Sequence, residues 1–239
     1  MIYPLLFGVL LIIAFRANFS DGKVKYGGEF WSDRGGYYIY LPATFIYGYH
    51  ISSYPESIDV KNGGGFQLDK KSQKVFTKYP SGVSLMILPF FLPTHFIAEQ
   101  FDLQPDGFSI VYHRMAVVAG VFYVVLSLFI LKVFLTYYFP RWISYLVPVL
   151  ILLSTNFYAY GMDHVVLSHL YSFFLASLLL LVTKVYLTRQ MKSFGLFILI
   201  CLILAVSVLI RPTNVLLVSV LFFWDVGSWH EIKQRFRHF

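Results

Sequence analysis

Charge is scarce in this sequence. Only 13% of its 239 residues are Asp, Glu, Lys or Arg, whereas a typical soluble domain has about 25%. Hydrophobic residues make up 58% of the chain, aromatic residues 20%, and the mean hydropathy is +0.67. This composition excludes an ordinary soluble domain and indicates an all-α integral membrane protein.

Cysteine and familiar catalytic motifs are also scarce. The single cysteine, Cys201, lies in a hydrophobic run and cannot form an internal disulfide bond. The chain has no P-loop, no G-x-G-x-x-G, no H-E-x-x-H and no internal repeat. The basic residues give a net charge of +7, but they are scattered between hydrophobic runs. Retention of cytoplasmic loops and attraction to anionic membrane lipid explain them better than nucleic acid does.

The hydrophobic runs predict about six transmembrane helices in one membrane domain. Residues 1–19 form the first span, 20–108 a large extracytoplasmic loop with juxtamembrane helices, 109–226 spans two to six, and 227–239 a cytoplasmic tail. The five later spans are expected at Ser109–Leu135, Trp142–Tyr158, Val165–Leu187, Ser193–Ile210 and Asn214–Trp224. We expect the first helix to be retained, because no Lys or Arg precedes its apolar core and no clear cleavage site follows it.

The segment Val83–Ala98 decides the topology. It is interrupted by Pro89 and Pro93 and is shorter than a typical span. If it crossed the membrane, five cations of the later loops would lie outside, against the positive-inside rule: Lys132, Arg141, Lys184, Arg189 and Lys192. We therefore predict that it lies along the outer surface and that the N-terminus is inside.

This topology gathers reactive side chains on the outer face. They are Asp33, Lys78, His113, Arg114, Asp163, His164, Ser168, His169 and Arg211. Such a set suits a reaction in which a carboxylate activates a nucleophile while cations hold a phosphate. A metal site is not expected, because His164 and His169 are five residues apart and do not share a helical face well.

Each of these residues also has a plainer interpretation. Charged side chains at helix ends can simply anchor the helix at the interface. Asp33, with Ser32, can cap a short amphipathic helix over Gly36–Tyr47. A capping role and a catalytic role are compatible, because the positive end of a helix favours a carboxylate.

Two motifs carry a family resemblance. The run Ser32-Asp33-Arg34-Gly35-Gly36-Tyr37-Tyr38, followed by Thr77-Lys78-Tyr79-Pro80-Ser81-Gly82, resembles the N-terminal half of GT-C superfamily membrane glycosyltransferases, particularly bacterial aminoarabinose transferases and protein O-mannosyltransferases. The resemblance implies that Asp33 is catalytic and that Lys78 contacts phosphate. It also aligns Arg114, His169 and Arg211 with recurrent outer-face positions, which implies substrate or phosphate binding for them.

The sequence departs from the family in two respects. Asp33 stands alone, whereas many members of that family have a paired Asp-Glu at this position, although Glu29 is near enough in the sequence to be its acidic partner. The chain also has fewer spans than the family usually has. A natural short form, a truncated reading frame and a companion chain that supplies further helices all fit this difference.

The expected function is transfer of a sugar from a polyprenyl-phosphate carrier to a glycan, lipid or protein acceptor of the cell envelope, with inversion. We expect it on the extracytoplasmic face of a bacterial inner membrane. The reaction requires no cofactor, and a divalent cation is compatible with it. The alternative is a non-catalytic membrane subunit or scaffold, or a lipid-carrier transporter. A transporter is expected to have broken helices, and Pro148 is the one internal proline in the later spans.

Overall fold

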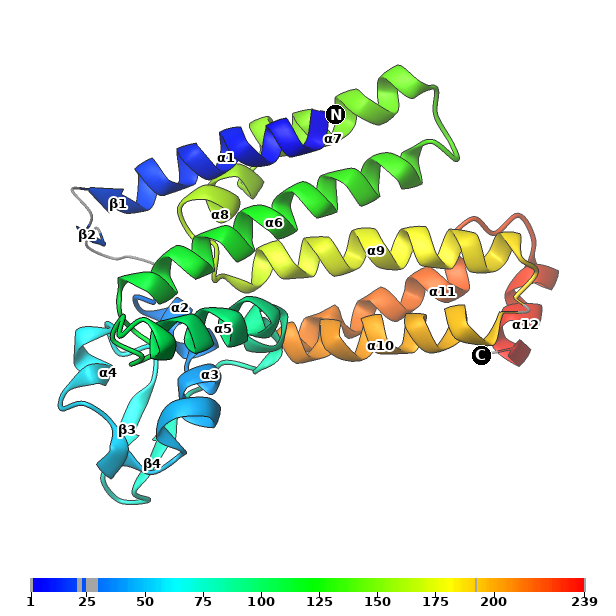
Figure 1. Cartoon of the computed structure of the whole chain (residues 1–239). Coiled ribbons are helices and arrows are strands. Elements are labelled where there is room, and N and C mark those ends of the chain that lie inside the picture. Colours follow the sequence, from blue (N-terminus) through cyan, green and yellow to red (C-terminus); the bar gives the residue numbers. More distant parts are fainter. Residues whose placement is uncertain (1, 21–22, 25–29, 192, 239) are drawn as a thin grey trace.

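The computed structural model describes residues 2–20, 23–24, 30–191 and 193–238, and these form a mostly helical protein (Figure 1). An elongated bundle contains the apolar helices α1 (Ile2–Asn18), α6 (Ile110–Leu135), α7 (Arg141–Ser154), α9 (Ser168–Thr188) and α10 (Phe194–Ile210), together with η3 (Pro212–Val218) and α11 (Ser219–Phe223). From α6 onward, the long helices run back and forth along the bundle (Figure 1).

The centre of the bundle is the pair α6 and α9, whose facing side chains are buried. Small residues permit close packing around α6. A Cβ atom on Gly120 would collide with Val165, and one on Gly161 would collide with Val124. Glycine at such contacts lets apolar segments approach closely, which favours association inside a membrane.

Three helices of the described residues are long and apolar enough to cross a membrane, judged by length and composition: α5 (Gly82–Gln100), α6 and α9. The sequence expectation of a helical protein with membrane-spanning segments is therefore confirmed in this coarser form. The shorter apolar helices α1, α7 and α10, and the stretch Pro212–Phe223, have 10–17 residues each. The six-span arrangement stays a prediction.

One end of the bundle carries most of the polar first loop, and we call it the loop end. It contains α2 (Asp33–Tyr38), α3 (Tyr40–Pro42), the π-helical turn η1 (Ala43–Tyr47), η2 (Ile51–Ser53), α4 (Ile58–Lys61) and the antiparallel hairpin of β3 (Gln67–Asp69) and β4 (Lys74–Phe76). A second, two-residue pairing joins β1 (Phe19–Ser20) to β2 (Lys23–Val24). The first loop has its own small core, in which Ile39, Ala43, Tyr54 and Phe66 are buried.

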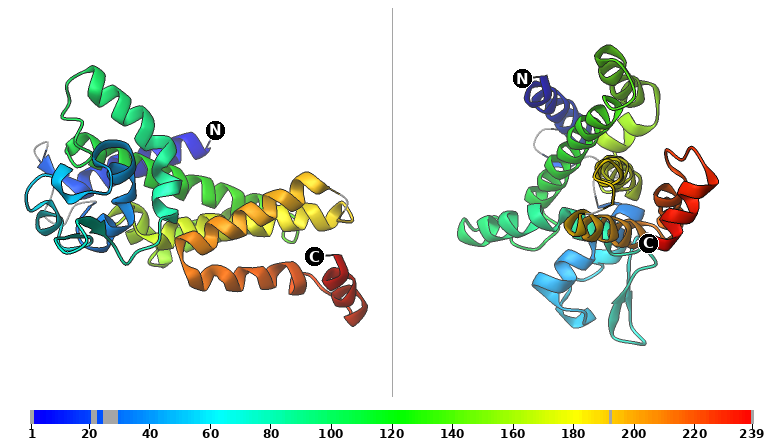
Figure 2. Two further views of the ribbon diagram at one scale, coloured as in Figure 1. Left: turned by 90° about the horizontal axis from the view of Figure 1, so that it is seen from below. Right: turned by 90° about the vertical axis from the view of Figure 1, so that its right-hand side faces the viewer.

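Helix α5 differs in length from the prediction. It has 19 residues despite Pro89 and Pro93, so the expectation that this segment is shorter than a span is wrong by length. Its direction, however, is crosswise: both views in Figure 2 show it running across the bundle at the loop end. Gly82 sits against the backbone of Leu209 and Ile210, where a Cβ atom would collide. Close backbone contact thus fixes the start of α5 against the end of α10.

Two of the predicted spans are wrong in detail. The segment Trp142–Tyr158 is broken, because α7 ends at Ser154 and a separate helix, α8 (Phe157–Met162), follows. The Thr155 hydroxyl donates to the Ile151 carbonyl over 2.6 Å and accepts from the Phe157 N–H at 3.1 Å. Such hydrogen bonds from a side chain compete with the backbone hydrogen bonds of a helix. The last segment begins at Pro212, as a 3₁₀ helix, and ends at Phe223.

The opposite end of the bundle is the tail end, where α6, α9 and α11 finish and α12 (Trp229–His238) lies. Lys184 and Asp225 form an ion pair of 2.7 Å there. The Tyr138 hydroxyl donates to the same carboxylate and accepts from the Trp224 indole, at 3.1 Å in each case. The Lys184 ammonium lowers the pKa of Asp225. Of the cations predicted to lie inside, Lys192 falls outside the described residues, and the others lie on elements that meet at this end.

Candidate active site

Asp33 is the first residue of α2, and its side chain is exposed at the loop end. Ser32 precedes it with a φ of 54°, and the Ser32 N–H donates to the Asn62 carbonyl over 2.8 Å. Gly65 lies directly against the Ser32 carbonyl, where a Cβ atom would collide. The glycine-rich turn after α4 therefore sets the backbone position from which Asp33 projects.

The capping interpretation is corrected by this geometry. Helix α2 begins at Asp33, before the predicted Gly36. Ser32 occupies the N-cap position, but its side chain makes no capping hydrogen bond. Its left-handed backbone turns the hydroxyl toward the neighbouring carboxylate, and Ser32 Oγ lies 3.4 Å from Asp33 Oδ1.

Tyr79 is the main partner of Asp33. Its hydroxyl donates a short hydrogen bond to Asp33 Oδ1. Burial raises the pKa of the Tyr79 phenol, and the hydrogen bond to Asp33 raises it further. The phenol therefore stays protonated at neutral pH and acts as a donor, which makes Asp33 the proton acceptor of the pair. Among the described residues, hydrogen bonds to this carboxylate are found at Oδ1 only.

Tyr79 is itself held from two sides. The Tyr40 hydroxyl donates to the Tyr79 carbonyl over 2.7 Å, and the Tyr37 ring lies 4.7 Å from the Tyr79 ring between centroids. The ammonium of the exposed Lys78 lies 5.2 Å from the Tyr79 ring centroid. The structure thus brings two sequence-predicted residues, Asp33 and Lys78, to the same tyrosine.

Helix α2 is bonded to the connection between α8 and α9. Arg34 is 8% exposed. Its guanidinium donates to the Asp163 carbonyl over 3.1 Å and lies 3.2 Å from His164 Nδ1. The Tyr37 hydroxyl donates to Ser168 Oγ over 3.1 Å. These bonds join segments about 130 residues apart. The loop that carries Asp33 is therefore fastened to the bundle.

Two other predicted residues form a separate pair. Arg211 Nη1 lies 3.0 Å from His169 Nδ1, and the Tyr160 ring stacks on the His169 ring with centroids 4.5 Å apart and planes 13° apart. His169 directly follows Ser168, the partner of Tyr37. The pair therefore lies at the loop end, next to the α2 contact, although no direct bond to Asp33 is found among the described residues.

The remaining predicted residues stand apart from Asp33. His113 is partly buried and packs on Phe30, with ring centroids 4.2 Å apart. Arg114 is exposed near the start of α6, and no contact joins it to Asp33 among the described residues. Glu29 lies outside the described residues. Within the described part of the chain, no three His, Cys, Asp or Glu side chains form a metal-binding group.

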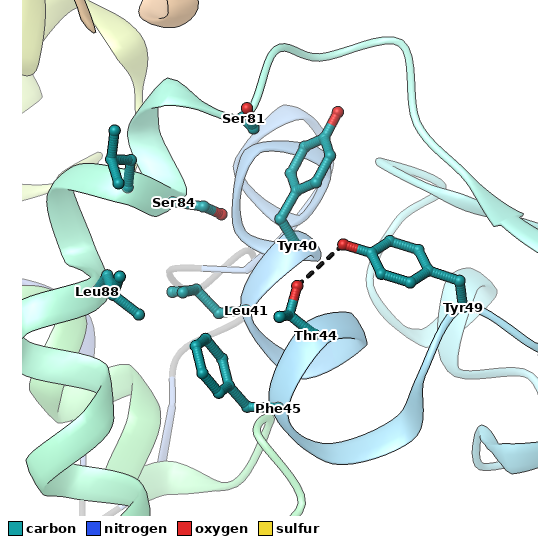
Figure 3. Close-up of a pocket in the computed structure, with 9 residues that line it drawn as sticks. Tyr40, Leu41, Thr44, Phe45, Tyr49, Ser81, Ser84 and Leu88 are labelled. Atoms are coloured by element: carbon teal, nitrogen blue, oxygen red, sulfur yellow. Dashed lines mark hydrogen bonds between the residues drawn. The ribbon is translucent and has the colours of Figure 1, made fainter.

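An apolar groove opens beside this site, between α3, η1 and the start of α5 (Figure 3). Its volume is about 380 Å³, and its lining residues are Tyr40, Leu41, Thr44, Phe45, Tyr49, Ser81, Ser84, Leu85 and Leu88. Tyr40 connects the groove to the site, because its hydroxyl holds the Tyr79 backbone. The Thr44 and Tyr49 hydroxyls are 2.9 Å apart at the groove wall (Figure 3).

Sequence reasoning missed Tyr79 and this groove. Tyr79 stands inside the quoted motif between Lys78 and Pro80, but a tyrosine near a membrane is usually an interface residue. The pairs Tyr40 with Thr44 and Leu41 with Phe45 have helical i, i+4 spacing, which indicates one wall of the groove. The other wall is the start of α5, and only the fold brings it there.

Comparison of the chain with known proteins finds no matching family model, no matching curated protein and no matching solved structure.

Proposed function

We propose that this protein is a glycosyltransferase that moves a sugar from a polyprenyl-phosphate carrier to a hydroxyl acceptor at the extracytoplasmic face of a membrane. The observation that carries the proposal is a carboxylate held by a tyrosine, beside a lysine, at an apolar groove. The resemblance of the two sequence motifs to GT-C enzymes supports the same function. In this proposal the loop end faces the outside.

Asp33 serves as the general base. Tyr79 occupies Oδ1 and orients the carboxylate, so that Oδ2 can accept the proton of an acceptor hydroxyl. As the proton leaves, the acceptor oxygen bonds to the anomeric carbon, and the bond from that carbon to the phosphate oxygen breaks. The polyprenyl phosphate departs as the anion. A single displacement of this kind inverts the anomeric centre.

The groove supplies a place for the carrier. Its volume of about 380 Å³ falls within the range of about 300–1,000 Å³ that small-molecule pockets occupy. The groove suits the isoprene units nearest the phosphate, and the rest of the chain would lie in lipid. Lys78 is exposed, close to Tyr79, and would bind the phosphate by a charge-assisted hydrogen bond. Arg211 and His169 are candidates for a second phosphate contact.

Donor binding tests this proposal without knowledge of the acceptor. We expect Lys78→Ala in the reconstituted full chain to weaken binding of polyprenyl phosphate about tenfold or more, because a hydrogen bond to a charged group contributes about 1.5–3 kcal/mol. The matched control is Lys71→Ala, which removes another exposed lysine at the turn between β3 and β4. Equal affinities of wild type and both variants would remove Lys78 from the phosphate site.

A second candidate function is lipid-carrier transport. The break between α7 and α8 supports it, because broken helices often mark transport sites. The variant Asp33→Asn distinguishes a transporter from a transferase. A transporter would still move the polyprenyl-phosphate sugar across proteoliposome membranes with this substitution, since no proton acceptor is needed. Transport activity equal in wild type and Asp33→Asn would favour this second candidate.

A further inference from the structure

The tail end carries an amphipathic helix whose two aromatic side chains are largely exposed. In α12, Trp229, Ile232 and Phe236 follow the i, i+3, i+7 spacing of one helical stripe. Trp229 is 77% exposed and Phe236 is 58% exposed. A helix with a strong hydrophobic stripe and low overall hydrophobicity is typical of the plane of a membrane interface.

Helix α12 is fastened to α11. The buried Arg235 donates to the carbonyls of Leu221 and Trp224, over 3.2 and 2.6 Å, and to that of Asp225 over 3.3 Å. An arginine placed on the last carbonyls of a helix is a favourable C-terminal partner. The Phe236 ring also stacks on the Phe222 ring, with centroids 4.4 Å apart. These contacts fix the direction of α12 relative to the bundle.

That direction is crosswise. Figure 2 shows α12 lengthwise in the view along the bundle, in which α9 is seen end-on. If the bundle axis is the membrane normal, α12 lies in the plane of the membrane surface. Trp229, the first residue of α12, then lies near the membrane surface, where indole rings are enriched in membrane proteins.

The polar face of α12 is basic. Lys233 and Arg237 are both exposed. Two further exposed cations, Arg141 at the start of α7 and Arg189 just after α9, belong to the same end of the bundle. Anionic lipid headgroups are the partner that matches cations flanking an apolar stripe, because the surface attracts the charge while the acyl boundary accepts the rings.

We propose that α12 is an anionic-lipid-binding helix, which lies in the membrane interface with Trp229 immersed and with Lys233 and Arg237 on lipid phosphates. The proposal does not depend on the transferase activity. Each cation contributes about 1 kcal/mol near an anionic surface, which is about fivefold in an association constant. Loss of both therefore weakens the association by about 25-fold.

The test uses the full chain with Cys201→Ser, since Cys201 is the only cysteine and is exposed. A nitroxide label is attached at Trp229→Cys or at Gln234→Cys, which lies on the polar face. The protein is reconstituted in vesicles of phosphatidylcholine alone, or of phosphatidylcholine with phosphatidylglycerol. Collisions of each label with oxygen, which is enriched in lipid, and with a water-soluble nickel chelate are measured by electron paramagnetic resonance.

We expect the label at position 229 to collide with oxygen and avoid nickel in the anionic vesicles, and the label at position 234 to show the reverse. Adding Lys233→Gln and Arg237→Gln should return the label at 229 toward water, because the two cations no longer draw α12 to the anionic surface. Arg235 is unchanged in this variant, so the attachment of α12 to α11 is kept. The matched control neutralises Lys70 and Lys71 at the loop end and should change neither label.

Three results would overturn the proposal. The first is a label at 229 that meets nickel equally in both kinds of vesicle. The second is immersion that persists in phosphatidylcholine alone and is unaffected by the two glutamines, which would mean that the cations are not involved. The third is a label at 229 shielded from both reagents, which would mean that this face packs on protein.

Discussion

Replacement of Asp33 by Asn is the most direct test of the proposed chemistry. The side chain is exposed at the start of α2, and surface substitutions of this kind usually change stability by no more than about 0.5 kcal/mol. The Asn amide oxygen can still accept the hydrogen bond from Tyr79. The amide cannot accept a proton at neutral pH, so only the base is lost.

The expected loss follows from the role of the base. General-base catalysis is typically worth about 100- to 10,000-fold in rate, so we expect transfer by Asp33→Asn to fall by that factor. Tyr79→Phe tests the orientation of the base alone, because Asp33 remains and only the hydrogen bond from Tyr79 is removed. A hydrogen bond to a charged group contributes about 1.5–3 kcal/mol. We therefore expect a smaller loss for this variant, of about 10- to 150-fold.

The assay follows release of polyprenyl phosphate from a polyprenyl-phosphate sugar in native membranes, which supply acceptors and any companion chain. Expression, thermal stability and donor binding are measured for each variant. Severe loss of release by Asp33→Asn, with donor binding intact, is the expected result. Full release by this variant would refute the reasoning. Loss of folding together with activity would instead give Asp33 a structural role.

Two further predictions concern topology and the backbone at the site. In a Cys201→Ser background, a cysteine at the exposed Ser57 should react with an impermeant thiol reagent in intact cells, and one at the exposed Gln190 should not; the reverse pattern would place the loop end inside. Gly65→Ala should reduce transfer while the bundle stays folded, because its Cβ would collide with the Ser32 carbonyl and displace Asp33. Wild-type transfer by Gly65→Ala would show that the position of Ser32 is not critical.

The sequence predicted the long helices well and their interruptions poorly. The predicted Ser109–Leu135 and Val165–Leu187 correspond closely to α6 and α9, because long apolar runs leave few alternatives to a helix. The break at Thr155 depends on two local hydrogen bonds of one hydroxyl, and hydropathy does not register these. The sequence underestimates the length of α5, because its two prolines indicate interruptions, yet the helix continues through both.

The candidate site could likewise be predicted only in part. The place of Asp33 in a polar loop after a hydrophobic segment predicts it as a site residue, and the family resemblance implies a phosphate contact for Lys78. Their common partner Tyr79 was not found, because 46 residues separate it from Asp33 and the contact depends on how the loop folds. Arg114 stays a predicted phosphate-binding residue: it is exposed near the start of α6, with no contact to Asp33 among the described residues.

Arg34 indicates which part of the molecule controls the position of Asp33. A buried charge is costly unless hydrogen bonds compensate it, and here they come from Asp163 and His164, which precede α9. Because Arg34 is adjacent to Asp33, a shift of the α8–α9 connection would move the carboxylate relative to Tyr79. Tyr79 is held by Tyr40, which belongs to the first loop. Asp33 is therefore positioned both by the glycine-rich turn of the first loop and, through Arg34, by the bundle. Tyr79 is held within the loop, so the hydrogen bond between the two residues depends on the docking of the loop onto the bundle. A fragment that contains only the first loop would lack these bundle contacts. We therefore expect that Asp33 and Tyr79 would not keep this geometry in such a fragment.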